Sequence, residues 1–141
     1  RTMQNWVGGT SPSNARFVPP PASELAQCLG DFEKYINLHN DLPPLVNCAL
    51  LHYQFETLHP FNDGNGRVGR LLITLYLVSK GILDHPVLYL SAYLKIHQQE
   101  YYDRLQQVRT DGTYEKWVAF FLEGVEDACR LSRCRRCAHP L

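Results

Sequence analysis

The sequence lacks both a charge imbalance and a long apolar run. Its 14 basic residues balance its 14 acidic residues, so no net field would attract this chain to nucleic acid or to an anionic membrane. No apolar stretch approaches the roughly 20 residues that a membrane-spanning helix requires, and the N-terminus shows no signal-peptide pattern. We therefore expect neither a nucleic acid nor a membrane as a partner.

The sequence contains five cysteines, which is the wrong parity for all of them to pair within the chain. An odd number favours reduced thiols and predicts a cytoplasmic protein. The step from Cys134 to Cys137, followed by His139, could contribute to a zinc site, but a zinc ribbon needs a second ligand pair at a suitable distance. The sequence has no such pair. We therefore interpret residues 130–141 as a basic, cysteine-containing tail that is disordered or forms a truncated helix.

Repeats and low-complexity tracts are absent as well, and a hydrophobic content of 45% excludes a disordered chain. The length fits one domain, which we place at residues 1–129. Apolar periodicity and helix-breaking residues predict an all-α fold, with helices over 23–38, 44–59, 67–80, 86–94, 97–109 and from Thr113 onward. The helix over 67–80 is apolar over most of its surface, so we expect it to be the central buried helix. Glycines and prolines in residues 5–20 predict a small β-hairpin near the N-terminus.

What the sequence does contain is a dense polar run between two apolar helices: His59-Pro60-Phe61-Asn62-Asp63-Gly64-Asn65-Gly66-Arg67-Val68-Gly69-Arg70. Gly64 and Gly66 can adopt the positive φ that lets backbone N–H groups converge on an anion. The helix that begins near Arg67 points its positive end at the same place. Arg67 and Arg70, three residues apart, share a helix face on which guanidinium groups suit phosphate oxygens. The run therefore predicts a polyphosphate site.

Two further residues of the run add chemistry. Asp63 is its only carboxylate, a hard ligand suited to Mg²⁺ that is bound jointly with phosphates. His59 can be neutral near physiological pH and can accept a proton from a hydroxyl group. Taken singly, each residue also fits a structural role, such as an Asp-Gly turn or a solvated arginine face, and we interpret Phe61 as a plug of the apolar core. Together, at this spacing, the residues predict transfer from a nucleoside triphosphate.

The run resembles the signature of the Fic family, HPFx(D/E)GN(G/K)RxxR, and matches it at every specified position. Residues 5–9 and 15–21 resemble the segment that forms the family's flap, and the resemblance extends to about Ala128. It implies a Fic-type helical bundle. It also implies AMP transfer from Mg·ATP to a tyrosine, threonine or serine hydroxyl of another protein, with release of pyrophosphate.

The resemblance implies roles by position. His59 would be the general base on the target hydroxyl, and Asp63 would hold Mg²⁺ between the α- and β-phosphates. The residues that would contact the ATP phosphates are Gly64, Asn65 and Gly66 in an anion cradle, with Arg67 and Arg70 at the β/γ end. Tyr101 and Tyr102 stand where relatives place an aromatic residue near the adenine, although a tyrosine pair also fits the core and its rim. Residues 5–20 would dock the target protein by backbone pairing.

Regulation and the choice of donor stay open. Many Fic proteins carry an inhibitory helix with an (S/T)xxxE(G/N) motif, but the nearest match here, Glu123-Gly124, has Ala119 at the Ser/Thr position. We therefore expect the inhibitory glutamate to come from an N-terminal region before Arg1 or from a separate antitoxin-like chain. Alternative enzymatic functions are transfer of phosphate, UMP or phosphocholine, or removal of AMP. From a different class, the chain could be a nucleotide-binding regulatory module or an antitoxin-controlled toxin.

Overall fold

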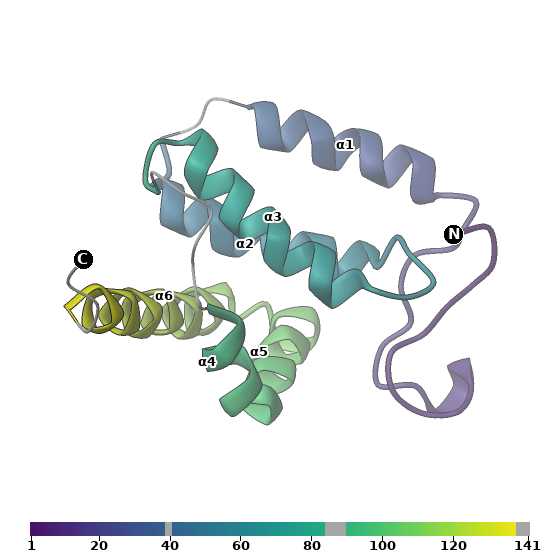
Figure 1. Ribbon diagram of the computed structural model, residues 1–141. Coiled ribbons are helices and arrows are strands. Elements are labelled where there is room, and N and C mark those ends of the chain that lie inside the picture. The colour runs from purple at the N-terminus through teal and green to yellow at the C-terminus, as the bar shows by residue number, and fades with distance from the viewer. Residues whose placement is uncertain (39–40, 84–89, 138–141) are drawn as a thin grey trace.

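The computed structural model describes residues 1–38, 41–83 and 90–137, with side chains as far as Leu131. Within these ranges it contains six α-helices, a single 3₁₀ turn η1 (Pro12–Asn14) and no regular β-strand (Figure 1). The helices are α1 (Leu25–Asn37), α2 (Pro44–Leu58), α3 (Asn65–Ser79), α4 (Leu90–Ile96), α5 (Gln98–Asp111) and α6 (Tyr114–Cys137). The expected all-α class is confirmed.

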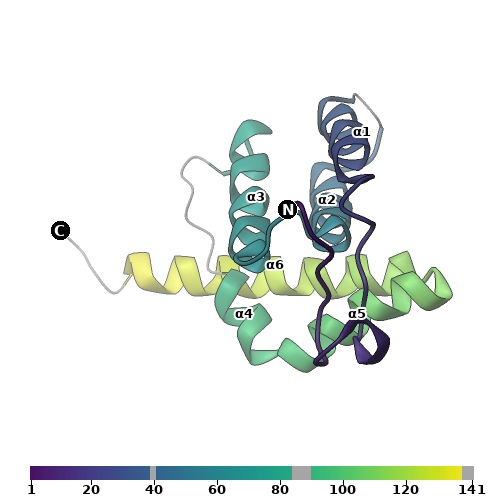
Figure 2. The ribbon, with the colours of Figure 1, turned by 90° about the vertical axis from the view of Figure 1, so that its right-hand side faces the viewer.

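The central helix of the bundle is α2. In Figure 2, α2 and α3 stand side by side across α6, and α2 packs against α1, α3 and α6. The sequence-based expectation that the helix over 67–80 is central is wrong, because α3 leaves Leu71 and Leu75 53% and 52% exposed. Both helices are apolar on most of their sides, so hydrophobicity alone could not tell which one has neighbours all around it.

The crossing of α2 and α6 is fixed by Trp117. This side chain is 0% exposed, and its indole Nε1 donates a hydrogen bond of 2.8 Å to the carbonyl of Ala49 on α2. A buried tryptophan contributes a large apolar area, and the hydrogen bond removes the penalty of burying its N–H group. The other tryptophan, Trp6, lies in the N-terminal segment and is 39% exposed.

The N-terminal segment does not form the expected hairpin of two strands. Val7 and Phe17 make one isolated antiparallel bridge, in which the Val7 N–H donates to the Phe17 carbonyl at 2.9 Å. Gly8 and Gly9 both have positive φ, and η1 follows at residues 12–14, so the residues between the bridge partners form a turn. The three prolines at 19–21 have no N–H to donate, which prevents pairing from extending on the other side.

The α2–α3 connection begins and ends with left-handed residues. α2 starts at Pro44 as expected and stops at Leu58, because His59 adopts φ 45° and ψ 58° before Pro60. α3 starts at Asn65, two residues earlier than predicted, after Gly64 with φ 84°. Glycine suits this conformation, since a side chain would be strained there. These two residues bracket the loop that carries the predicted site.

The C-terminal half differs from expectation at its boundaries. The helix expected over 86–94 corresponds to α4 from Leu90, and residues 84–89 lie outside the described residues. α6 continues to Cys137, so the backbone from Arg130 to Cys137 is helical, whereas His139 lies outside the described residues. No helix in the described ranges has the length and apolar character needed to cross a membrane.

Candidate functional site

The shape of the loop between α2 and α3 is held by Asn65. Its Oδ1 accepts a 2.8 Å hydrogen bond from the Phe61 N–H, and its Nδ2 donates to the Phe61 carbonyl at 2.7 Å. Both polar atoms of the Asn65 side chain are therefore hydrogen bonded to the loop backbone. Phe61 itself is 45% exposed and touches the core only at its edge, near the Phe55 ring, so its interpretation as a core plug is wrong. The asparagine, rather than the phenylalanine, fixes the loop.

The start of α3 offers N–H groups to an anion. The first hydrogen bond of the helix runs from the Val68 N–H to the Gly64 carbonyl at 3.0 Å, which leaves the amides of residues 65–67 without intrahelical acceptors. Gly64 has the positive φ that the sequence suggested, but Gly66 does not. Gly66 instead provides space, because a Cβ at this position would lie 3.1 Å from Arg70 Nη1. The helix N-terminus thus has the geometry of an anion site.

Arg67 and Arg70 meet at one pocket, as their spacing predicts. Both line a hollow of about 280 Å³ that also includes Thr74 and Ser91. Arg67 Nη2 forms an ion pair of 3.2 Å with Asp63 Oδ2, and both side chains are mostly exposed. Such a pair contributes little stability, so a bound phosphate could replace it at small cost.

Asp63 suits Mg²⁺ only in partnership with a nucleotide. Among the described side chains, no group of three or more His, Cys, Asp and Glu residues could hold a metal ion. A single exposed carboxylate nevertheless fits the usual mode of Mg²⁺, which keeps waters and takes its other ligands from substrate phosphates. The donor set therefore fits a nucleotide-bound Mg²⁺ rather than a permanent metal centre.

His59 is held by its backbone and kept neutral by its surroundings. Its carbonyl accepts hydrogen bonds from Arg1 Nε at 3.1 Å and from Asn5 Nδ2 at 3.2 Å, and Asn5 Nδ2 also reaches the Phe61 carbonyl at 3.0 Å. Burial lowers the pKa of the imidazole, and the charges of Arg1 and Arg109 add to this effect. Its Nδ1 is buried and has no hydrogen-bond partner in the described part of the chain. A neutral imidazole is the form that can accept a proton.

Tyr101 and Tyr102 differ in their surroundings although they are adjacent. Both line a second hollow of about 360 Å³, together with Arg70 and Lys95. Tyr101 is buried, and its hydroxyl lies 2.9 Å from His52 Nε2, whereas Tyr102 is 36% exposed. Their proposed proximity to an adenine stays a prediction.

Two polar residues that the sequence analysis did not select lie beneath this site. His52 and Glu56 are buried on α2, where α3 approaches so closely that a Cβ at Gly69 would lie 2.6 Å from Glu56 Oε1. Glu56 Oε1 has no hydrogen-bond partner among the described residues, and burial raises the pKa of its carboxyl to about 7, against the effect of Arg70 and Arg109. A histidine and a glutamate four residues apart on a largely apolar helix were the available signal.

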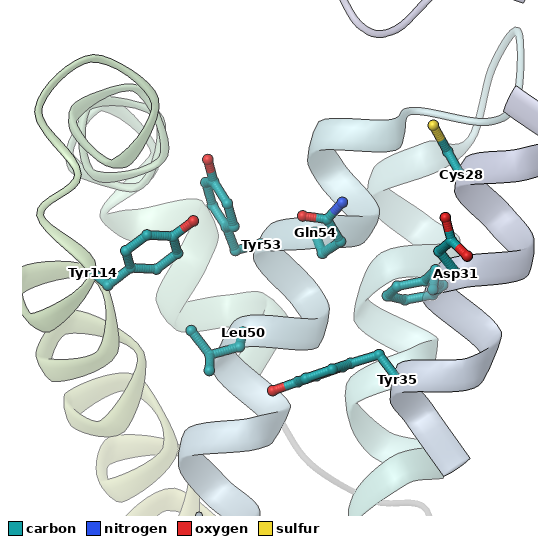
Figure 3. Close-up of a pocket in the computed structure, with 8 residues that line it drawn as sticks. Cys28, Asp31, Tyr35, Leu50, Tyr53, Gln54 and Tyr114 are labelled. Atoms are coloured by element: carbon teal, nitrogen blue, oxygen red, sulfur yellow. The ribbon is translucent and has the colours of Figure 1, made fainter. Parts of the chain in front are cut away.

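A separate cavity of about 410 Å³ lies between α1, α2 and the start of α6. Figure 3 shows Tyr53 and Tyr114 on one side of it, with Cys28, Asp31 and Tyr35 from α1 on the other. No residue of the 59–70 loop lines this cavity. It is therefore distinct from the predicted phosphate site.

The Fic/DOC family model matches residues 1–77, which include the whole loop from His59 to Arg70. The chain belongs to the Fic/DOC family. It is 32% identical over 128 residues to the protein adenylyltransferase Fic of Culex quinquefasciatus and 33% identical to that of Aedes aegypti. Each alignment covers 89% of this chain but only 23% of the relative, so the chain spans about a quarter of the length of these Fic proteins.

A solved structure agrees with this assignment. The crystal structure of a Fic family protein from Desulfovibrio desulfuricans G20 has a TM-score of 0.75 and 30% identity to this chain, covering 89% of this chain and 37% of that one. The helical bundle described above is thus the Fic fold, and its curated relatives place the chain in a family of enzymes. The roles of individual residues in this chain stay predictions.

Proposed function

We propose that this chain transfers AMP from Mg·ATP to a hydroxyl group of a target protein and releases pyrophosphate. One observation supports this most strongly: a single loop has a histidine with a lowered pKa at one end and a helix N-terminus with free amides at the other. Both groups are needed when a hydroxyl attacks a phosphate. The names of the adenylyltransferase relatives agree with ATP as the donor.

In the proposed reaction, His59 accepts the proton of the target hydroxyl as the hydroxyl oxygen forms a bond to the α-phosphorus. The bond from the α-phosphorus to the oxygen shared with the β-phosphate breaks, and pyrophosphate leaves. The amides at the start of α3, with Arg67 and Arg70, stabilise the negative charge on the phosphates. Mg²⁺ held by Asp63 would neutralise further charge between the α- and β-phosphates when bound. Catalysis is then mainly positioning and charge stabilisation.

The proposal involves two protein partners, a target and an inhibitor. The target protein docks along the flap (residues 5–20), which is tied to the loop through Asn5 and the His59 carbonyl. A glutamate from an N-terminal segment before Arg1 or from a separate antitoxin-like chain would inhibit by pairing with Arg70, because Ala119 stands where the motif in α6 would need Ser or Thr. Arg70 lines an open hollow where such a side chain could enter.

The test is incubation of the purified chain with Mg²⁺, cell lysate and ATP labelled at the α-phosphate. Relative to lysate without the chain, we expect the chain to add label to protein with α-labelled ATP and to add none with γ-labelled ATP. His59→Ala should abolish labelling, a loss of at least about 100-fold for a general base. The matched control is His97→Ala, which removes an exposed histidine at the start of α5 and should leave labelling unchanged. Label from the γ-phosphate that appears only when the chain is added, or labelling by the His59→Ala chain equal to that by the wild-type chain, would contradict the proposal.

A further inference from the structure

The flap is attached to α5 by side chains that the signature does not include. We infer that Arg109 is a positioning residue that holds the flap in place over the loop through its stacking on Phe17. This inference rests on the proposed function, because it concerns how the target segment is presented to His59. Arg109 would act on the target through the flap, without contacting the ATP.

The contact between Arg109 and Phe17 is close. The guanidinium carbon of Arg109 lies 3.6 Å from the centroid of the Phe17 ring and 5.9 Å from that of Tyr53. Phe17 is also the residue whose backbone closes the flap by pairing with Val7. A planar cation stacked on an aromatic ring at this distance is attractive, and more so when it is partly withdrawn from water. Arg109 therefore holds the one backbone bridge that defines the flap.

A second contact attaches the flap to α5 two helical turns away. Arg16 forms an ion pair with Asp103, and its guanidinium carbon lies 5.5 Å from the centroid of Tyr102. The returning side of the flap is thus fixed to α5 at two adjacent residues, Arg16 and Phe17. Figure 2 shows the N-terminal segment running between the α2–α3 loop and α5.

The outgoing side of the flap is attached to the loop, as the bonds from Asn5 Nδ2 to the His59 and Phe61 carbonyls show. The flap consequently spans two supports, the loop at one end and α5 at the other. A change in its attachment to α5 would alter how the flap lies relative to His59. The Arg67–Asp63 pair would stay as it is, because no hydrogen bond or ion pair among the described residues joins it to Arg109.

The surroundings of Arg109 explain why stacking has to orient it. Its Nε is buried and has no hydrogen-bond partner among the described residues, and the same is true of Glu56 Oε1. The charges of Arg109 and Glu56 attract each other, and Arg109 Nη1 donates a long hydrogen bond of 3.5 Å to Gln106 Oε1. The planar guanidinium is then aligned by the Phe17 ring. A lysine would keep the charge but lose this planar contact.

The first test measures the flap without any reliance on activity. In hydrogen exchange of the whole chain, we expect Arg109→Lys and Phe17→Leu each to speed exchange of the Val7 and Phe17 amides by about tenfold, the loss of one stacked cation–π contact. Peptides from α2 should be unchanged. The control is Arg104→Lys on the same helix, since Arg104 pairs with Glu100 and not with the flap. Unchanged exchange in the flap would overturn the inference.

The second test uses the transfer reaction with the protein that becomes labelled as acceptor. Arg109→Lys should raise KM for that acceptor by about tenfold, while KM and calorimetric binding of Mg·ATP stay within twofold. In a Phe17→Leu background, the same substitution should add less than twofold, because the contact is already lost. Weaker ATP binding with an unchanged acceptor KM would overturn the inference and make Arg109 a nucleotide contact. Absence of transfer by the wild-type chain would overturn the proposed function alone, and the exchange test would still decide the role of Arg109.

Discussion

His52 and Glu56 lie one turn apart on α2 and are both buried, but their polar atoms have different surroundings. Both ring nitrogens of His52 have partners, since Nδ1 lies 3.1 Å from the Gly69 carbonyl and Nε2 lies 2.9 Å from the Tyr101 hydroxyl. Glu56 Oε1 has no hydrogen-bond partner in the described ranges. A buried group with all its hydrogen bonds stabilises a fold, whereas an unpartnered one costs stability. The same helix thus supports the bundle at one turn and, at the next, carries a buried carboxyl oxygen that has no hydrogen-bond partner among the described residues.

The largest expected loss of stability comes from removing His52, the residue of this pair whose hydrogen bonds are all made. His52→Ala should lower the free energy of unfolding by about 3 kcal/mol, because it leaves a cavity and removes the partner of the Tyr101 hydroxyl. Urea unfolding monitored by circular dichroism would measure the loss. His97→Ala, at an exposed histidine, should cost less than about 1 kcal/mol. Similar losses of unfolding free energy in the two variants would show that the buried hydrogen bonds of His52 do not stabilise the fold.

His52 should also make the fold sensitive to acid. Burial lowers the pKa of its imidazole to about 4, so the unfolded chain binds a proton more readily than the folded chain. The contribution of His52 is therefore present above the unfolded pKa of about 6.5 and is lost as the pH falls through about 4.

The next effect tests the close approach that brings His52 and Glu56 against α3. Gly69→Ala should destabilise the fold by about 2 kcal/mol, since the added methyl group would lie 2.6 Å from Glu56 Oε1 and 3.1 Å from His52 Cε1. The matched control is Gly30→Ala in α1, where a Cβ would meet nothing within 4 Å and where alanine should stabilise the helix by up to about 1 kcal/mol. Thermal unfolding of both variants would show opposite shifts of Tm.

The last effect, which appears only as the pH rises, sharpens the comparison at Glu56. Its folded-state pKa of about 7 exceeds the unfolded value of about 4.5, so the wild-type fold loses stability as the pH rises between these values. Glu56→Gln keeps the shape and removes the titration. We expect the variant to equal the wild-type chain in stability below pH 4.5 and to be more stable by about 3 kcal/mol above pH 7. A difference that does not change with pH would mean that Glu56 is not a buried carboxyl of raised pKa.

The sequence predicted the loop well because its residues act through local geometry. Gly64 adopts positive φ, and Arg67 and Arg70 line one hollow, since both properties follow from spacing along the chain. Phe61 could not be placed from the sequence, because an aromatic residue in a loop can turn either inward or outward. Asn65 looked like a phosphate ligand, whereas its side chain is hydrogen bonded to the Phe61 backbone.

Long-range relations were harder to predict from the sequence. The sequence predicted α3 as the central helix, whereas α2 is central. Which helix is central depends on where α1 and α6 pack, and apolar periodicity does not encode that. The flap was predicted as a hairpin from its glycines and prolines, but those residues form a turn around a single Val7–Phe17 bridge. Its contacts with Asp103 and Arg109 join residues that are far apart in the chain, and no local pattern marks them.

The two tryptophans have a practical consequence. Trp117 is 0% exposed inside the bundle, whereas Trp6 is 39% exposed on the flap. Indole emission shifts to longer wavelength as water reaches the ring, so Trp117 emits at short wavelength until the bundle opens, and Trp6 emits at longer wavelength throughout. A dissolved quencher would reach Trp6 first. The chain therefore carries two optical reporters, one for its interior and one for its flap, and a spectrum can distinguish movement of the flap from unfolding without any added dye.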